Sequence, residues 1–75
     1  MAQWQPATRE VSDRLRETRV SKGLSQDDVA QAANIDRKTV NRIERYHFAP
    51  NLDTLFRLCK ALDIKPTSLF KGIKP

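Results

Sequence analysis

Apolar side chains recur along this chain at spacings of three and four residues, and no segment alternates regularly between apolar and polar positions. Such spacings are typical of amphipathic helices, whereas strands favour a period of two. Runs of turn-forming residues separate the apolar segments, so the pattern predicts five short helices. We expect a loose arm over residues 1–7, with Pro6 as the turn-forming residue near its end, and one compact all-α domain over residues 8–75.

The first helix is predicted over about residues 9–22, with Thr8 as its N-cap and Gly23 at its C-terminal end. Val11 and Leu15 are one helical turn apart in this segment. They should therefore share the face that packs against the rest of the domain.

A capping box is the signal for the second helix. Ser25 is followed three residues later by Asp28, which stands where Glu is the preferred partner. The box predicts a short helix through about residue 33. Its buried face should consist of Val29, Ala30 and Ala33.

The third helix divides sharply into two faces. Asp36 is placed as the N-cap of a helix over about residues 37–46. At about 100° per residue, Val40 and Ile43 lie on one side of that helix. The opposite arc is polar and mostly basic: Arg37, Lys38, Asn41, Arg42 and Arg45.

The last two helices are expected near the C-terminus. Asn51 should cap a fourth helix that runs to about Asp63, and Pro66 begins a final short helix in which Leu69 and Phe70 face inward. The fourth helix is the most apolar, with Leu52, Leu55, Phe56, Leu58, Cys59 and Leu62.

Charge narrows the class of partner. The chain has 14 Lys and Arg against 9 Asp and Glu, a formal net charge of +5. A basic balance of this size fits a polyanionic partner, either nucleic acid or anionic lipid. The absence of any run of about 18 apolar residues argues against a membrane span, and no secretion signal is recognisable, so we expect a cytoplasmic protein.

Several classes of site are not expected. One cysteine, Cys59, and one histidine, His47, cannot form a disulfide framework or a zinc or haem motif, so no cofactor is predicted. Cys59 is expected to fill the core and His47 to lie in an exposed loop. We find no glycine-rich phosphate loop, no nucleophile–base pair and no small-molecule pocket signature, so we do not expect an enzyme.

A set of apolar and polar positions carries a family likeness: Leu24, Ser25, Gln26, Val29, Ala30, Ile35, Val40, Ile43, Glu44, Arg45, Pro50 and Leu55. From about Val11 to Phe70 the chain resembles the lambda-repressor-like family, the phage-repressor and xenobiotic-response-element type of helix-turn-helix. The resemblance implies a compact five-helix DNA-binding domain with the helix-turn-helix over about residues 25–46. The third helix would then lie in the major groove.

The resemblance also implies which side chains read bases. Arg37, Lys38 and Arg42 match family positions that reach base edges, and Asn41 lies between them as a further candidate. An Arg fork engages guanine N7 and O6 together, and Asn can pair with adenine N6 and N7. On charge alone, the same basic arc would be an ordinary solvated surface, so the functional interpretation depends on the helix-turn-helix context.

Phosphate contacts are expected from three places. Gln26 matches the family glutamine that begins the second helix and hydrogen-bonds a phosphate. Asn51 and Leu52 match the start of the fourth helix, where backbone N–H groups meet a phosphate. Thr39 and Arg45 are further candidates, although Arg45 could instead offset the dipole at the end of the third helix.

Two family positions concern structure. Arg19 and Glu44 match an ion pair that ties the first helix to the third. Tyr46 departs from the family pattern, which usually has Gly after the Glu-Arg pair. A positive φ costs a non-glycine residue about 1–2 kcal/mol. Either the helix ends differently, therefore, or Tyr46 has another role, such as lying along the DNA backbone.

The sequence favours a transcriptional regulator, a repressor that reads a palindromic operator in double-stranded DNA. Because one recognition helix reads only a few base pairs, we expect a homodimer. Leu69, Phe70 and Ile73 exceed what a small helical core absorbs and are the predicted interface. The alternative is an antitoxin or another interaction protein whose main partner is a protein, although few residues remain for a partner-binding segment.

Overall fold

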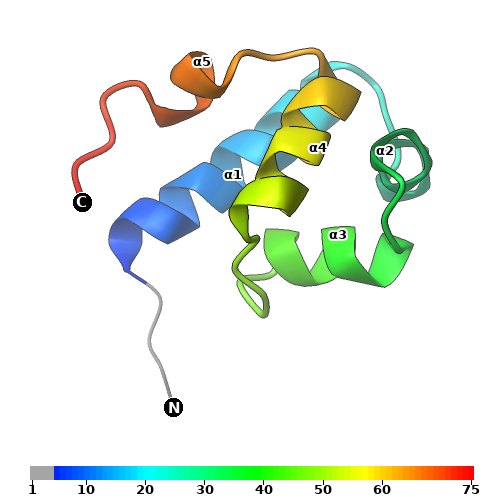
Figure 1. Ribbon diagram of the computed structural model, residues 1–75, viewed down its shortest axis with the longest axis horizontal. Helices are drawn as coiled ribbons and strands as arrows, with labels where there is room; N and C mark the ends of the chain where they lie inside the picture. The colour runs from blue at the N-terminus through cyan, green and yellow to red at the C-terminus, as the bar shows by residue number, and fades with distance from the viewer. Residues whose placement is uncertain (1–4) are drawn as a thin grey trace.

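Five helices form the part of the chain that the structure, a computed structural model, describes, which is residues 5–75 (Figure 1). No strand occurs within those residues, and the predicted all-α fold is confirmed. Trp4 and the first residues of the predicted arm lie outside the described part. The helices are α1 (Pro6–Ser21), α2 (Gln26–Ala33), α3 (Arg37–Glu44), α4 (Leu52–Leu62) and α5 (Pro66–Phe70).

The helices enclose one small core. α2 packs against α3 and α4, while α1 contacts α3, α4 and α5. Figure 1 shows α2 and α3 at one end of the molecule and α5 at the other, with α1 and α4 between them. The buried face predicted for α2 is confirmed. The buried apolar side chains are Val11, Leu15, Val29, Ala30, Ala33, Val40, Ile43, Leu55, Leu58, Cys59, Leu62 and Leu69.

α1 begins earlier than the sequence predicts. Its first residue is Pro6, preceded by Gln5 as N-cap, so the prediction of Thr8 as the cap is wrong and the predicted arm overlaps the helix. Proline is well suited to the first helical position, because its φ is already helical and it has no N–H to leave unpaired. The helix therefore extends back to the proline instead of starting at the polar residue that follows it.

Side-chain caps begin two of the other helices, as predicted. At α2, the Ser25 hydroxyl accepts from the Asp28 N–H, and the Asp28 carboxylate accepts from the Ser25 N–H, both at 2.9 Å. The hydrogen bond from the Ser25 backbone, with a further contribution from its side chain, lowers the pKa of Asp28. At α4, Asn51 Oδ1 accepts from the Thr54 N–H at 2.8 Å. Asp36 occupies the N-cap position of α3 but makes no side-chain capping bond, contrary to expectation.

Four helices end with the same backbone motif. At the end of α3, the His47 N–H donates to the Arg42 carbonyl at 2.7 Å, and the Tyr46 N–H donates to the Ile43 carbonyl at 3.2 Å. This pair of bonds is a Schellman motif, which needs one residue at positive φ. In α1 to α4 that residue is Gly23 (70°), Asn34 (56°), Tyr46 (63°) and Asp63 (54°).

The residue after the positive-φ position differs at the end of α3. Leu24, Ile35 and Ile64 follow that position in the other three motifs, and each packs against the core. His47, the corresponding residue of α3, is exposed, as the sequence predicted for it. The end of α3 therefore lacks the hydrophobic contact that usually accompanies the motif.

The two apolar residues of α5 lie in different surroundings. Leu69 is 2% exposed and belongs to the core, whereas Phe70 is 44% exposed, so the prediction that both face inward is wrong for Phe70. Arg14 on α1 holds this end of the chain by donating to the carbonyls of Leu69 at 3.0 Å and Lys71 at 2.6 Å.

Candidate nucleic-acid interface

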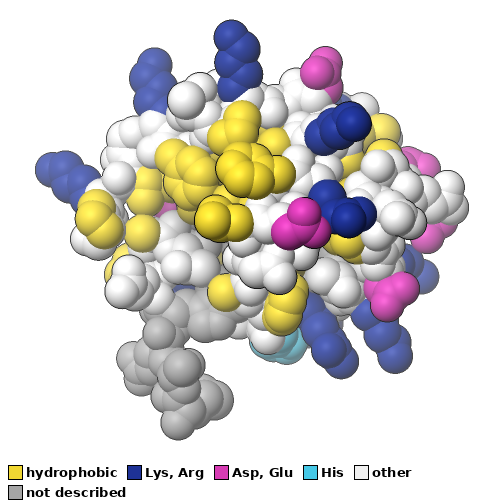
Figure 2. Space-filling view, in the orientation of Figure 1, with side chains coloured by type: hydrophobic (Ala, Val, Ile, Leu, Met, Phe, Trp, Pro, Cys, Tyr) yellow, Lys and Arg dark blue, Asp and Glu magenta, His cyan; other side chains and the backbone are white. Residues whose placement is uncertain are grey.

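α3 is anchored on one side and exposed on the other. Val40 and Ile43 are buried in the core. Arg37, Lys38 and Arg42 are exposed, and within residues 5–75 their side chains make no hydrogen bond or ion pair. Figure 2 shows Lys and Arg side chains projecting from the part of the surface where Figure 1 places α3. The helix thus presents cationic donors that have no competing partner in the described chain.

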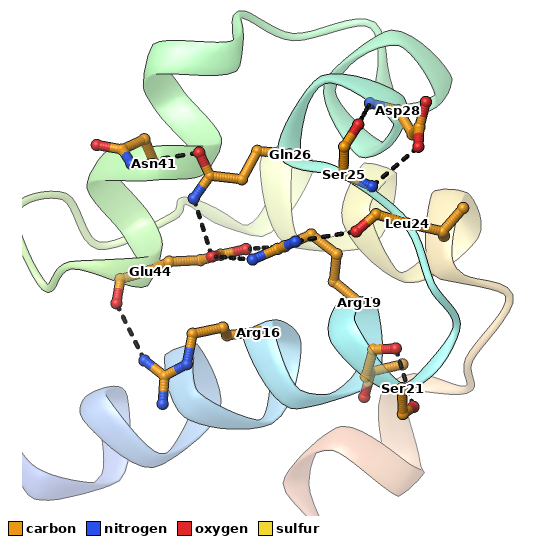
Figure 3. A network of polar contacts seen from close by, with 10 residues as sticks. Arg16, Arg19, Ser21, Leu24, Ser25, Gln26, Asp28, Asn41 and Glu44 are labelled. Atoms are coloured by element: carbon orange, nitrogen blue, oxygen red, sulfur yellow. Dashed lines mark hydrogen bonds and ion pairs between the residues drawn. The ribbon is translucent and has the colours of Figure 1, made fainter.

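A buried ion pair fixes α3 against α1. Arg19 Nε donates to Glu44 Oε2 at 2.7 Å, and Arg19 Nη2 donates to Glu44 Oε1 at 2.9 Å (Figure 3). The side chains are 15% and 6% exposed. Arg19 Nη1 also donates to the Leu24 carbonyl at 2.9 Å. The hydrogen bond to Glu44 raises the pKa of Arg19, so the guanidinium stays charged across the physiological range.

The ion pair continues into a chain of amide hydrogen bonds that sequence reasoning missed. Gln26 Nε2 donates to Glu44 Oε1 at 3.0 Å, and Asn41 Nδ2 donates to Gln26 Oε1 at 3.2 Å (Figure 3). Gln26 begins α2 and Asn41 lies in the middle of α3, so these bonds join the two helices of the helix-turn-helix. Asn41 is half-buried, unlike the cationic residues around it.

Tyr46 is held by α1. Its hydroxyl donates to Asp13 Oδ1, and the Arg9 guanidinium lies 4.7 Å from the centroid of its ring. A hydrogen bond with Tyr46 raises the pKa of Arg16, which also pairs with Asp13 at 3.2 Å. The first interpretation from the sequence, a different helix ending, is wrong, because Tyr46 itself adopts the left-handed conformation. Tyr46 has a further role, as the second interpretation proposed, but the role that the structure contains is contact with α1.

The residues expected at phosphates surround the exposed face of α3. Arg45 is exposed and Thr39 half-buried. The Asn51 side chain caps α4 by accepting from the Thr54 N–H. The backbone N–H groups that come before it, at the start of α4, have no intrahelical acceptor, as in any helix. Gln26 and Arg37 line an open hollow of about 510 Å³ at the starts of α2 and α3.

A second exposed surface is apolar. Figure 2 shows hydrophobic side chains gathered over and beside α4. The large exposed hydrophobic residues of α4 and α5 are Leu52, Phe56 and Phe70. Beside them, a groove of about 400 Å³ is lined by Leu52, Phe70 and Ile73 together with Val11 of α1. Leu69, which the sequence assigned to an interface with these residues, is buried inside the chain and is not available for one.

Residues 5–75 contain no cluster of His, Cys, Asp and Glu able to hold a metal ion. No helix of the described part is both long and apolar enough to cross a membrane. Cys59 is buried in the core, as predicted, and burial raises the pKa of its thiol.

Comparisons with known proteins agree with this geometry. A helix-turn-helix family model matches residues 15–69. The chain is similar to YgzD of Bacillus subtilis, an uncharacterized HTH-type transcriptional regulator, with 28% identity over 60 residues that cover 80% of this chain and 91% of YgzD. The resemblance to the lambda-repressor-like proteins is confirmed.

Two restriction-modification controller proteins have similar solved structures. The controller protein C.AhdI from Aeromonas hydrophila is 41% identical, with a TM-score of 0.78 over 81% of this chain and 92% of C.AhdI. The controller protein C.Esp1396I, solved as a tetramer with its natural 35-base-pair operator, is 26% identical, with a TM-score of 0.85 over 93% of this chain and 92% of that one.

Proposed function

We infer the function of this chain from its family, because the chain belongs to the helix-turn-helix family. It is a DNA-binding transcriptional regulator, and we propose that it represses transcription by binding a palindromic operator. One observation carries the proposal: α3 exposes cationic side chains, unpaired within residues 5–75, on the face opposite its buried anchors, Val40 and Ile43. An exposed helix of this kind fits the width of the major groove.

Arg37, Lys38 and Arg42 are proposed as the base-reading residues. Because their side chains make no hydrogen bond or ion pair within residues 5–75, they bind DNA without breaking an existing bond. Arg is suited to guanine, whose N7 and O6 both accept from the guanidinium fork, and Lys supplies a point charge to the same acceptors. Asn41 is proposed as a fourth reader, which contacts a base through its uncharged carboxamide.

Phosphate contacts are proposed at both ends of this face. Gln26 uses one Nε2 hydrogen on Glu44, and its second hydrogen remains for a phosphate oxygen. The backbone N–H groups of Asn51 and Leu52 at the start of α4 are suited to an anion, since the N-terminus of a helix is its positive end. Thr39 and Arg45 flank the base-reading residues and complete the proposed set.

The working unit is proposed to be a homodimer. A single α3 reads too few base pairs to select one site in a genome, so two copies are needed. The tetrameric operator complex of C.Esp1396I supports several copies on one operator. The proposed interface contains Phe70 and Ile73, which border the apolar groove, and excludes the buried Leu69.

Repression needs no contact beyond those with DNA, since a protein bound over a promoter excludes the polymerase. The proposal also involves no chemical step and no cofactor. A regulator of this kind acts where the genome is, so we place the protein in the cytoplasm, on the nucleoid.

Selection of duplexes from a random pool tests the proposal. The full chain is mixed with the pool at about 0.15 M salt, because weaker screening favours sequence-independent binding. The selected sequences should converge on a near-palindrome with half-sites about one helical turn apart. A selected pool without a shared sequence would contradict operator reading.

A further inference from the structure

We propose that Gln26 is a positioning residue that fixes the orientation of the Asn41 carboxamide. In that orientation Asn41 turns its oxygen toward the DNA and selects a base with an exocyclic amino group in the major groove. The inference rests on the proposed function, because it names the chemical class of base that one residue of α3 reads.

Glu44 determines which end of the Gln26 amide faces it. Its carboxylate is an acceptor only, and it is held in place by the two bonds from Arg19. A glutamine beside such a carboxylate must approach it with the amide nitrogen, since two oxygens would repel each other. The amide nitrogen of Gln26 lies 3.0 Å from Glu44 Oε1, as this reasoning requires.

The orientation of the Gln26 amide in turn determines the orientation of the Asn41 amide. With its nitrogen committed to Glu44, Gln26 offers its Oε1 to α3, and the partner there has to be a donor. Asn41 supplies Nδ2 at 3.2 Å, and Figure 3 shows the other end of the Asn41 amide, its Oδ1, turned away from Gln26. A free asparagine can present either end of its amide, but Gln26 holds this one in a single orientation.

An outward oxygen distinguishes two classes of base. In the major groove, adenine N6 and cytosine N4 are donors, whereas thymine O4 and guanine O6 are acceptors. Asn41 Oδ1 accepts from the amino groups and is repelled by the carbonyl oxygens. Binding is therefore penalised where the base presents a carbonyl oxygen instead of an amino group. Specific interfaces commonly exclude unwanted partners through such repulsive contacts.

A purely structural role for these bonds makes a different prediction. If Gln26 only joined α2 to α3, its loss would weaken binding to every duplex to a similar degree. If it positions Asn41, its loss removes the discrimination at one base pair and leaves the preferences at the others.

The experiment begins by locating the base pair. Asn41→Ala should lose its preference at one base pair of each half-site. Two modified duplexes are then made at that base pair. In one, the amino group is removed (adenine to purine, or cytosine to pyrimidin-2-one). In the other, the major-groove carbonyl oxygen of the opposite base is removed (thymine to 5-methylpyrimidin-2-one, or guanine to 2-aminopurine). Wild-type protein should bind about tenfold more weakly to the amino-deleted duplex, roughly the cost of one base contact. Deletion of the carbonyl should have little effect.

Gln26→Met then tests the positioning, because methionine keeps the side-chain length and removes both amide bonds. This variant should distinguish the intact and amino-deleted duplexes by about twofold or less, compared with the tenfold of the wild type. Gln31→Met is the matched control, since Gln31 is an exposed glutamine of the same helix, and its one side-chain hydrogen bond among the described residues is to Asp27, at 3.2 Å. It should keep the wild-type discrimination. Melting curves establish that each variant is folded during the titrations.

Four results would count against these ideas in different ways. A wild-type protein that responds to carbonyl deletion and not to amino deletion would overturn the orientation of Asn41, and this test needs no variant. A Gln26→Met protein that still distinguishes the intact and amino-deleted duplexes tenfold would overturn the positioning role, whatever affinity it loses on all duplexes together through the proposed phosphate contact. Equal binding of the wild type to the intact, amino-deleted and carbonyl-deleted duplexes would overturn base reading by Asn41, whereas equal binding to cognate and scrambled duplexes would contradict the proposed function itself.

Discussion

Arg19 and Glu44 join α1 to α3 through two parallel hydrogen bonds, of 2.7 and 2.9 Å, between a guanidinium and a carboxylate that are both largely buried. The pair sets the position of α3 relative to the rest of the domain, and through Gln26 it reaches a residue on the proposed DNA-binding face. A single buried contact thus contributes both to stability and to the arrangement of the proposed interface.

Glu44→Ala should destabilise the protein by about 3 kcal/mol, because it leaves the buried Arg19 charge without its partner. Thermal or urea denaturation measures this loss. Glu17→Ala, which removes an exposed carboxylate of α1, is the control and should change stability by less than about 0.5 kcal/mol. Equal melting temperatures for Glu44→Ala and the wild type would show that the pair is not stabilising.

Tyr46→Phe should destabilise the protein by about 1 kcal/mol. The substitution keeps the backbone at positive φ and keeps the ring under Arg9, but it removes the hydroxyl that donates to Asp13. The measurement is the free energy of unfolding in urea. A Phe variant as stable as the wild type would mean that the hydroxyl does not help to hold the left-handed residue.

The pKa of Asp28 predicts a pH dependence of stability. Because hydrogen bonds from Ser25 lower this pKa in the folded state, the carboxylate contributes stability above its unfolded pKa of about 3.9. That contribution is lost as the pH falls through the lower, folded pKa. Asp28→Asn should therefore have a shallower decline in melting temperature than the wild type between about pH 5 and pH 2.

The comparison for this pH profile is Asp27→Asn, which removes a neighbouring carboxylate that does not bond to Ser25. Its profile should decline more steeply than that of Asp28→Asn. Identical acid profiles for Asp28→Asn and the wild type would exclude a contribution of the capping carboxylate to acid stability.

Phe70→Asp should reduce self-association. The substitution places a charge on the exposed apolar surface beside the groove, where a partner subunit would have to desolvate it. Sedimentation of the free protein and of the operator complex gives the number of copies. Val20→Asp, on an exposed residue of α1, is the control and should assemble like the wild type. A Phe70→Asp variant that still binds as two copies would rule out this interface.

Local signals in the sequence predicted most of the framework. The capping box at Ser25 and the cap at Asn51 depend on residues only three apart, and the structure contains both. The buried faces of α2 and α3 follow from helical periodicity and are present as predicted. The buried face of α5 was not predicted correctly, because a five-residue helix has too few turns for periodicity to separate the buried Leu69 from the exposed Phe70.

Features that depend on how the helices dock were not predictable in the same way. Gln26 and Asn41 are 15 residues apart, and nothing local indicates that their amides meet. The signal that could have found the contact was the expected position of Glu44, since a carboxylate beside the first residue of α2 requires a donor. The contact of Tyr46 with Asp13 likewise spans 33 residues and depends on the packing of α1 against α3.

Base reading by α3 is the central claim, and titration of wild-type, Arg37→Ala and Arg42→Ala proteins on cognate and scrambled duplexes tests it most directly. Each alanine variant should lose about 1–3 kcal/mol on the cognate duplex and relax the preference at particular base pairs, with a much smaller loss on the scrambled duplex. Lys60→Ala, an exposed lysine of α4, is the control for loss of charge and should bind both duplexes like the wild type. Equal losses on cognate and scrambled DNA would contradict the claim, because these residues would then only hold phosphates.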